Sequence, residues 1–150
     1  MKKFLFISFL SLIFFSNCSY KNEYSRMENI NDSWSKKDTI NFNFKIKNAP
    51  TKKNINFVVR NNKDYLFSNL YLFIKLKQGK KVICTDTLNY KLADKTGKWL
   101  GSGMGSIKEI YFQYKKNFLF SKSEDYTISV VQGMRKDTLK GIVDFGVNIE

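Results

Sequence analysis

Apolar and polar residues alternate through most of the chain from residue 38 onward. In the segment DTINFNFKIK, apolar Ile40, Phe42, Phe44 and Ile46 are separated by single polar residues. Successive side chains of a β-strand point to opposite faces, so this spacing predicts a strand with one buried and one solvated face. The same period of two recurs in five other segments: NINFVVR, DTLNYKL, IYFQYK, YTISVVQ and GIVDFGVNIE.

Two further apolar segments, NLYLFIKLK and KVICT, raise the expected number of strands to about eight. Turn-forming residues separate these segments at positions 48–50, 61–64, 79, 95–97 and 121–125. No window of the sequence shows a long helical stripe with caps. We therefore expect an all-β fold, an antiparallel β-sandwich of about eight strands.

The segment NLYLFIKLK departs from simple alternation. One of its faces is aliphatic, but the other carries Tyr71 and Phe73, which an open face would leave in water. One interpretation is a central strand whose outer face is covered by a loop or by the N-terminal segment. The other is a docking surface for a partner.

The first 18 residues have the layout of a secretory signal. Two lysines precede an apolar run at 4–15, which is too short to span a bilayer as a permanent helix. Bacterial lipoprotein signals share this layout and end at an acylated cysteine, and the residues before Cys18 are similar to that pattern except at Phe15 and Asn17. We predict lipidation of Cys18. The alternative is an ordinary signal peptide that leaves Cys18 free to pair with Cys84.

The sequence after Cys18 predicts a tether followed by one domain. Residues 19–32 are polar and lack periodicity, which is typical of a flexible linker. The expected organisation is a lipoprotein signal peptide at 1–17, a lipidated cysteine and polar tether at 18–33, and a β-sandwich domain at 34–150. A mature chain of this length is the usual size of a single domain.

The chain carries a formal net charge of +13. A basic surface can serve nucleic acid, anionic lipid or an acidic polymer of the cell envelope. The lysines are, however, spread over the whole chain together with abundant Asn, Ile and Phe, a composition that AT-rich coding also produces. Because no nucleic-acid motif accompanies them and the chain is expected to be exported, we predict no nucleic-acid partner.

The residue types that are missing restrict the chemistry. The chain has no histidine and two cysteines, which excludes a Ser-His-Asp triad and any imidazole-based zinc site. The segment GSGMGS at 101–106 lacks the Lys-Ser/Thr of a phosphate loop, so a bulge or a close backbone approach is favoured. Among Glu109, Asp125 and Asp144, Asp144 is notable for its apolar neighbours, and a salt-bridged strand residue is the preferred interpretation. We predict no catalytic residue, no metal site and no cofactor.

Three long segments form a recognisable set: RNNKDYLFSNLYL at 60–72, DTLNYKLADKTGKWLGSGMG at 86–105 and QGMRKDTLKGIVDFGVNIE at 132–150. In order and spacing the set resembles the GldH family of gliding motility lipoproteins of the Bacteroidetes. The resemblance implies a component of the gliding motility and associated protein-secretion machinery, with no catalytic activity attributed to it. It also implies a lipid anchor in a membrane of the cell envelope, and we expect the domain to face the periplasm.

Two of these segments supply the candidate site. RNNKDY and ADKTGKWLG have the composition of loops at sheet ends, with Trp99 as an amphipathic anchor. We expect these loops to meet at one end of the sandwich and to bind other subunits of the machinery. The predicted partner-binding residues are Asn61, Asn62, Asp64, Tyr65, Asn69, Asp94, Lys98, Trp99 and Leu100.

Two other functions stay open at this point. A glycan-binding or peptidoglycan-associated module would show an exposed row of aromatic residues, such as Tyr71, Phe73 and Trp99, in one groove. An envelope hydrolase would show two carboxylates that converge in a cleft, one of them with a raised pKa.

Overall fold

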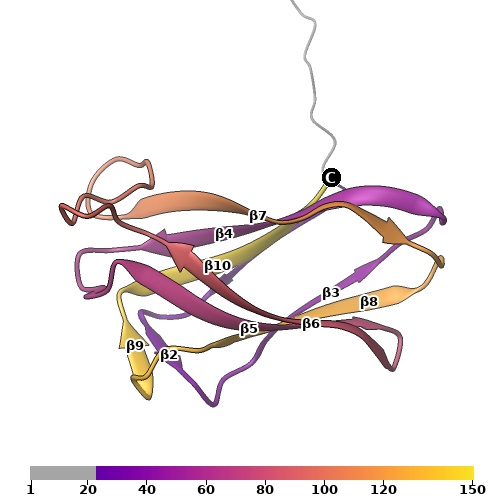
Figure 1. Ribbon diagram of the computed structural model, residues 1–150, viewed down its shortest axis with the longest axis horizontal. Helices are drawn as coiled ribbons and strands as arrows, with labels where there is room; N and C mark the ends of the chain where they lie inside the picture. The colour runs from indigo at the N-terminus through magenta and orange to yellow at the C-terminus, as the bar shows by residue number, and fades with distance from the viewer. Residues whose placement is uncertain (1–22) are drawn as a thin grey trace, which may run out of the picture.

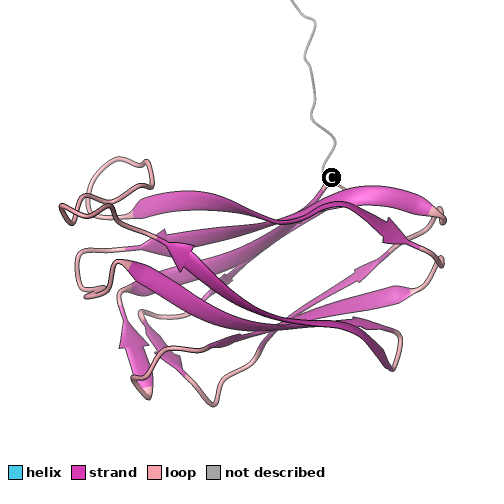
Figure 2. Ribbon diagram, viewed as in Figure 1, coloured by secondary structure: helices cyan, strands magenta, loops and turns pink. Residues whose placement is uncertain are grey.

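The computed structural model describes residues 23–150. Within this range the chain contains strands and no helix, so the predicted all-β class is confirmed (Figure 2). Ten strands follow one another in this order: β1 (Tyr24–Asn29), β2 (Ser33–Ser35), β3 (Ile40–Lys45), β4 (Thr51–Asn61), β5 (Asn69–Gln78), β6 (Lys81–Lys91), β7 (Lys108–Phe120), β8 (Asp125–Gln132), β9 (Thr138–Lys140) and β10 (Ile142–Ile149).

Two antiparallel sheets pack face to face as a sandwich (Figure 1). The first sheet has the strand order β1-β10-β4-β7 and the second has the order β3-β8-β5-β6. The short strands β2 and β9 pair separately and form a small two-stranded ribbon at one end. The long central strands β4 and β5 each pair with a neighbouring strand on both sides, although β5 pairs with β8 only from Leu72 onward.

The core lies between the inner faces, where the period-two pattern places apolar side chains. Phe57 of β4 packs against Phe145 of β10 with ring centroids 5.3 Å apart, and against Tyr114 of β7 at 4.7 Å. From the second sheet, Phe42 of β3 lies 6.1 Å from Phe145. The Trp34 ring, 1% exposed, closes the same cluster at 5.8 Å from Phe145. Burial of each large apolar side chain contributes about 1.5–3 kcal/mol.

Two predicted strands are one strand in the structure. KVICT and DTLNYKL form the continuous strand β6 and pair with β5 along nearly its whole length. Asp86, the first residue of the segment DTLNYKL, lies in the middle of β6. Its carboxylate accepts a hydrogen bond from Tyr114 Oη at 2.6 Å, so the strand does not need to turn to satisfy this group.

The predicted boundary between tether and domain is wrong. Residues 24–29, expected in the tether, form the edge strand β1 and pair with β10 from Tyr24 opposite Ile149 to Asn29 opposite Asp144. The pairing rests mainly on backbone hydrogen bonds, which a polar sequence makes as well as an apolar one. The folded domain therefore begins about ten residues earlier than the sequence indicated. Cys18 lies outside the described residues.

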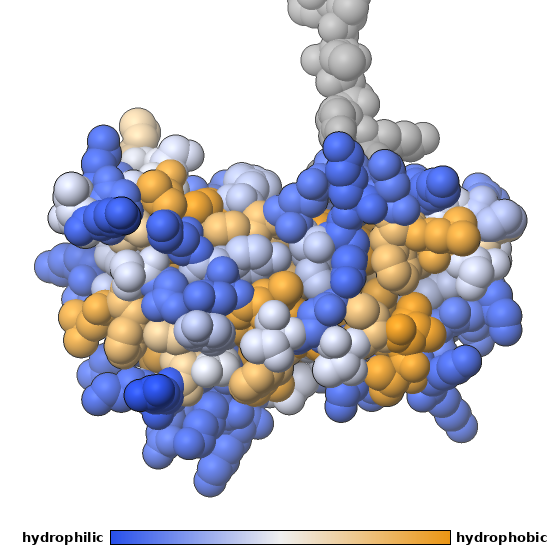
Figure 3. All heavy atoms as spheres, viewed as in Figure 1, coloured by the Kyte–Doolittle hydropathy of each residue, from blue (hydrophilic) through white to orange (hydrophobic). Residues whose placement is uncertain are grey.

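No helix among residues 23–150 is long and apolar enough to cross a membrane. On the face seen in Figure 3, hydrophilic side chains are spread between apolar patches.

Candidate partner-binding surface

Loops from both sheets gather at one end of the sandwich, on the left in Figure 1. The β4–β5 and β6–β7 loops are joined because Leu92 N and Ala93 N both donate to Ser68 O, at 2.8 and 3.0 Å. The β4–β5 loop also contacts the turn before β10, where Asn62 N donates to Gly141 O at 2.9 Å. The structure thus brings together the two loops from which the candidate residues were drawn.

Asn61 and Tyr65 are interior residues and offer no surface to a partner. Tyr65 is 2% exposed, and its hydroxyl donates to Asn69 O at 2.7 Å. Burial raises the pKa of Tyr65 well above its ordinary value. Asn61 is 1% exposed at the end of β4. Both were predicted to bind a partner, but the loop folds back over the core and buries them.

The backbone of Gly141 lies directly against the backbone of Tyr65, and this contact fixes the position of the β4–β5 loop. Gly141 has a φ of 85°, and a Cβ there would lie 2.0 Å from Tyr65 N. Asp32, expected in the tether, accepts hydrogen bonds from Gly141 N at 2.8 Å and Asn62 Nδ2 at 3.0 Å. Asn62 Oδ1 in turn accepts from Asp64 N at 2.8 Å. These polar side chains shape the loop, as Asn and Asp commonly do in turns.

The second loop is shaped in the same way. Asp94 Oδ1 accepts from Thr96 N at 2.8 Å, from Thr96 Oγ1 at 2.7 Å and from Lys98 N at 3.0 Å. These hydrogen bonds, that of Thr96 first, lower the pKa of Asp94. Trp99 is half-buried, with its ring 6.4 Å from Tyr65 and packed on the core, whereas Leu100 is exposed. Asp94 therefore stabilises the loop backbone, and Trp99 packs on the core, in addition to any role in binding.

Asn69 is the first residue of β5, next to the β4–β5 loop. Its Nδ2 donates to Asn89 Oδ1 of β6 at 2.7 Å, on the outer face of the second sheet.

Four apolar side chains project into solvent from these loops. Leu66 is 86% exposed and Met104 98%, and Leu100 and Ile107 are also exposed. We call these four residues the loop-end surface. Sequence reasoning found Leu100 and missed the other three, because no local pattern within a loop tells which apolar side chains face solvent.

In the glycine-rich segment at 101–106, two stretches of backbone lie close together, and Met104 is exposed at the tip. Ser102 N donates to Glu109 O at 2.9 Å, and Glu109 N donates back to Ser102 O at 2.7 Å. A Cβ on Gly101 would lie 2.7 Å from Glu109 O, so a larger residue does not fit there. The predicted close backbone approach is confirmed, and the narrow hairpin it makes carries Met104 away from the body of the domain.

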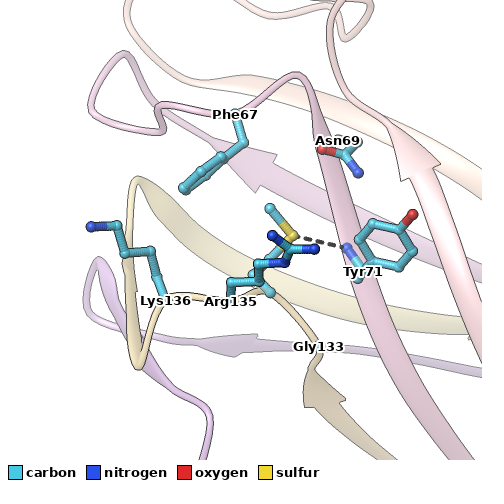
Figure 4. A pocket seen from close by; sticks show the side chains of 7 residues that line it. Phe67, Asn69, Tyr71, Gly133, Arg135 and Lys136 are labelled. Carbon is cyan, nitrogen blue, oxygen red and sulfur yellow. Dashed lines mark hydrogen bonds between the residues drawn. The ribbon is translucent and has the colours of Figure 1, made fainter.

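A groove lies beside the loop-end surface on the outer face of the second sheet (Figure 4). Its volume is about 760 Å³. The lining residues are Phe67, Asn69, Tyr71, Gly133, Met134, Arg135 and Lys136. In Figure 4, Tyr71 lies at one end and Lys136 at the other, with Arg135 between them. Sequence reasoning missed most of this groove because its walls come from segments more than 60 residues apart.

Tyr71 and Phe73 are exposed in the described structure, Phe73 by 51%. The interpretation in which a loop covers this face of β5 therefore fails for residues 23–150. Gly133 lies against Phe73, and a Cβ there would lie 3.0 Å from its ring, but this contact leaves half of the ring open. Trp99 packs against Tyr65 at the loop end instead of joining them. The single aromatic row that would indicate a glycan module is not formed.

The candidate acidic residues are held in ion pairs or lie apart. Arg60 Nε donates to Glu109 Oε2 at 2.5 Å, and Arg60 Nη1 lies 3.6 Å from Asp144 Oδ2. The hydrogen bond with Glu109 is the main cause that raises the pKa of Arg60. The preferred interpretation of Asp144, a salt-bridged strand residue, is confirmed. Asp125 is at the start of β8, opposite Lys45 of β3.

Comparison with known proteins identifies close sequence relatives. The family described as GldH lipoprotein matches residues 21–149. A gliding motility lipoprotein GldH homolog from Christiangramia forsetii is 35% identical, over 97% of this chain and 94% of the relative. The gliding motility lipoprotein GldH of Flavobacterium johnsoniae is 27% identical, over 96% of this chain and 94% of the relative.

Likeness to solved structures is weak. A family 35 carbohydrate binding module from Clostridium thermocellum is 9% identical with a TM-score of 0.38, over 83% of this chain and 97% of that one. Latent PorU from Porphyromonas gingivalis is 10% identical with a TM-score of 0.33, over 86% of this chain and 13% of that one. At these scores neither likeness bears on function. The sequence relatives are decisive, and the chain belongs to the GldH lipoprotein family.

Proposed function

We propose that this protein is a non-catalytic subunit of the gliding motility and associated protein-secretion machinery, and that it acts by binding another envelope protein through its loop end. The relatives support the setting, since both are named as gliding motility lipoproteins or homologs of them. The observation that carries the binding role is the loop-end surface. Four exposed apolar side chains on loops held by a rigid sandwich are suited to burial against a protein partner.

Binding accounts for the loop end better than turnover does. The chain has no histidine to act as a general base. Glu109 and Asp144 both contact Arg60 and lie on strands of the first sheet, so Arg60 stands between the two carboxylates as their shared ion-pair partner. The polar side chains of the loops, such as Asp94, are occupied by hydrogen bonds to the loop backbone. Beside exposed polar residues such as Lys63, Lys95 and Lys98, the loops leave four apolar side chains in solvent.

Lipidation of Cys18 would set the orientation of the domain. Five residues separate Cys18 from β1, and a fully extended chain of that length spans about 20 Å at most. Tyr24 is in register with Ile149, which is in register with Ile55 of β4. Ile55 is six residues, or about 20 Å, from Asn61, where the loop end begins. The anchor therefore holds the domain close to the membrane and leaves the loop end away from the attachment point.

Cys18→Ala tests the anchor. We expect the variant to remain an unprocessed precursor without lipid label, because acylation of the cysteine is required before the signal is cut. A variant that still incorporates labelled palmitate would contradict the assignment of Cys18.

Paired surface substitutions test the binding role in a gliding host. The chromosomal gene is replaced by Leu66→Ser/Leu100→Ser, and Val82→Ser serves as the control, since Val82 is exposed on β6 at the opposite end. All three residues are exposed, so the variants should keep the stability of the native protein. We expect the double variant to lose gliding at normal protein levels and the control to glide. Normal gliding by the double variant would refute the role of the loop end, and hydrolysis of envelope polymers by the purified protein would refute a non-catalytic function.

A further inference from the structure

Strand β5 has an open edge at its start. On one side it pairs with β6 from Asn69 onward. On the other side its pairing with β8 begins only at Leu72 opposite Gln132. On the side that faces β8, residues Asn69–Tyr71 therefore have no neighbouring strand among residues 23–150. This open edge forms one wall of the groove in Figure 4.

The backbone amide of Tyr71 on this edge is satisfied by a weak acceptor. Tyr71 N donates to Met134 Sδ at 3.3 Å, the dashed line in Figure 4. A thioether sulfur accepts hydrogen bonds poorly compared with a peptide carbonyl. Tyr71 O accepts a hydrogen bond from Gly133 N at 2.7 Å. The chain after β8 therefore makes one more backbone hydrogen bond to β5 and then turns away from it. The Met134 side chain takes the place that a strand carbonyl would occupy.

The walls of the groove combine apolar and cationic groups. Phe67 and Met134 are half-buried, and Tyr71 is partly exposed, so together they offer an apolar floor. Arg135 and Lys136 are exposed and have no ion-pair partner in the described part of the chain. The nearby carboxylate of Asp137 is already paired with Lys36. The groove therefore carries unneutralised positive charge beside an apolar surface.

We propose that this groove binds an extended acidic segment of the partner protein, which adds a short strand to the open edge of β5. A carbonyl of the segment accepts the Tyr71 N–H in place of Met134 Sδ. The displaced Met134, a flexible and adaptable side chain, then packs with Phe67 around an apolar residue of the segment. A carboxylate near that residue pairs with Arg135 or Lys136. Strand addition supplies affinity through main-chain bonds and specificity through alternate side chains.

This inference rests on the proposed function and specifies the chemistry of its partner. A strand amide that is bonded to a weak, replaceable acceptor matches the backbone carbonyl of a peptide. Sugar rings would use the flat face of Tyr71 instead and would have no need of the amide. The state of the Tyr71 N–H therefore separates the two kinds of ligand.

The experiment uses purified protein and synthetic probes. Every strand and all described core residues lie between Tyr24 and Ile149, so a chain that starts at Ser19 retains the complete sandwich. The first probe is an acetylated eight-residue peptide in which Glu alternates with Val and Phe. The second has Lys in place of every Glu, and the third is a tetramer of N-acetylglucosamine. Binding is measured by fluorescence polarisation or calorimetry, and the Tyr71 amide is followed by NMR.

We expect the acidic peptide to bind, to shift the Tyr71 amide resonance and to slow its hydrogen exchange. Arg135→Glu/Lys136→Glu should weaken binding at least tenfold, because attraction of the carboxylates becomes repulsion. The matched control is Lys80→Glu/Lys81→Glu, an adjacent exposed pair at the far turn of the same sheet, and it should change the affinity less than about twofold. Met134→Leu keeps the apolar wall but removes the sulfur, so the free protein should exchange the Tyr71 amide faster and still bind the peptide.

Three results would overturn the inference. These are equal binding of the acidic and basic peptides, binding that leaves the Tyr71 amide unchanged, and a Tyr71 ring that responds to the tetrasaccharide while the peptides have no effect. A failure of this inference can be distinguished from a failure of the proposed function. If the acidic peptide does not bind but Leu66→Ser/Leu100→Ser still abolishes gliding, the loop end stands as the binding surface and the groove does not.

Discussion

Asp86 links the two sheets, and its removal should make stability depend on pH in a defined way. β6 and β7 are edge strands of different sheets and are not paired with each other. Asp86 Oδ2 of β6 accepts from Tyr114 Oη at 2.6 Å and from Cys84 Sγ at 2.9 Å, and Lys115 Nζ lies 2.8 Å away. The hydrogen bond from Cys84, then those from Lys115 and Tyr114, lower the pKa of Asp86 to about 2.

The size of the effect follows from this pKa. A carboxyl whose pKa is about 4 in the unfolded chain and about 2 in the folded one would stabilise the folded state by about 3 kcal/mol at neutral pH. Because Asp86 is partly exposed, solvent screening reduces this to about 2 kcal/mol. Because the folded pKa is depressed, the contribution is complete above the unfolded pKa and is lost as the pH falls through the folded one. Asp86→Asn removes the charge and should destabilise the protein by about 2 kcal/mol at pH near 7.

Urea unfolding of both proteins over a range of pH tests this reasoning. Other carboxylates titrate equally in the two proteins, so the difference in free energy of unfolding isolates Asp86. We expect that difference to be constant from about pH 7 to pH 5 and to shrink steadily between about pH 4 and pH 2. A difference that does not change with pH would mean that Asp86 acts through shape and not through its charge.

Three further substitutions or truncations have defined outcomes. Gly141→Ala should destabilise the protein by more than about 2 kcal/mol in urea unfolding, because the φ of 85° is strained for alanine and its Cβ would collide with Tyr65 N; an unchanged midpoint would show that the loop adjusts freely. A chain that starts at Asn31 lacks β1 and should melt at a lower temperature than one that starts at Asn22, because the pairing with β10 is lost; equal melting would return the domain boundary to residue 34. Trp99→Ala should cost about 1–3 kcal/mol, because the half-buried ring packs on Tyr65; full stability would make Trp99 a pure surface anchor.

The strands of the sandwich were predictable where one face is buried and the other is wet. In β3, Phe42 and Phe44 alternate with exposed Asn41 and Asn43, and the structure keeps this register. β1 was not predictable in this way. It is an edge strand with no fully buried side chain, and its place depends on backbone pairing with β10, which leaves no periodic signal.

The loops were predictable as a group and not residue by residue. Their composition indicated turns at a sheet end, and the structure places them together. Which side chains face solvent depends on contacts between distant segments. Tyr65 is buried because Gly141 lets the backbone come close, whereas Leu66, its neighbour in sequence, is almost fully exposed. The groove needs Phe67 and Met134 side by side, which only the folded sheet provides.

Site-specific photo-crosslinking in living, gliding cells reports directly on the loop end. A photoreactive phenylalanine analogue is placed at Leu66 or Leu100 in the lipid-anchored protein, and at Val82 as the control on the opposite end. If the loop end is the binding surface, both loop positions form a crosslink to the same envelope protein, that protein is itself required for gliding, and Val82 forms none. Crosslinking to that protein from Val82 alone, or no crosslink from either loop position in cells that glide normally, would contradict it.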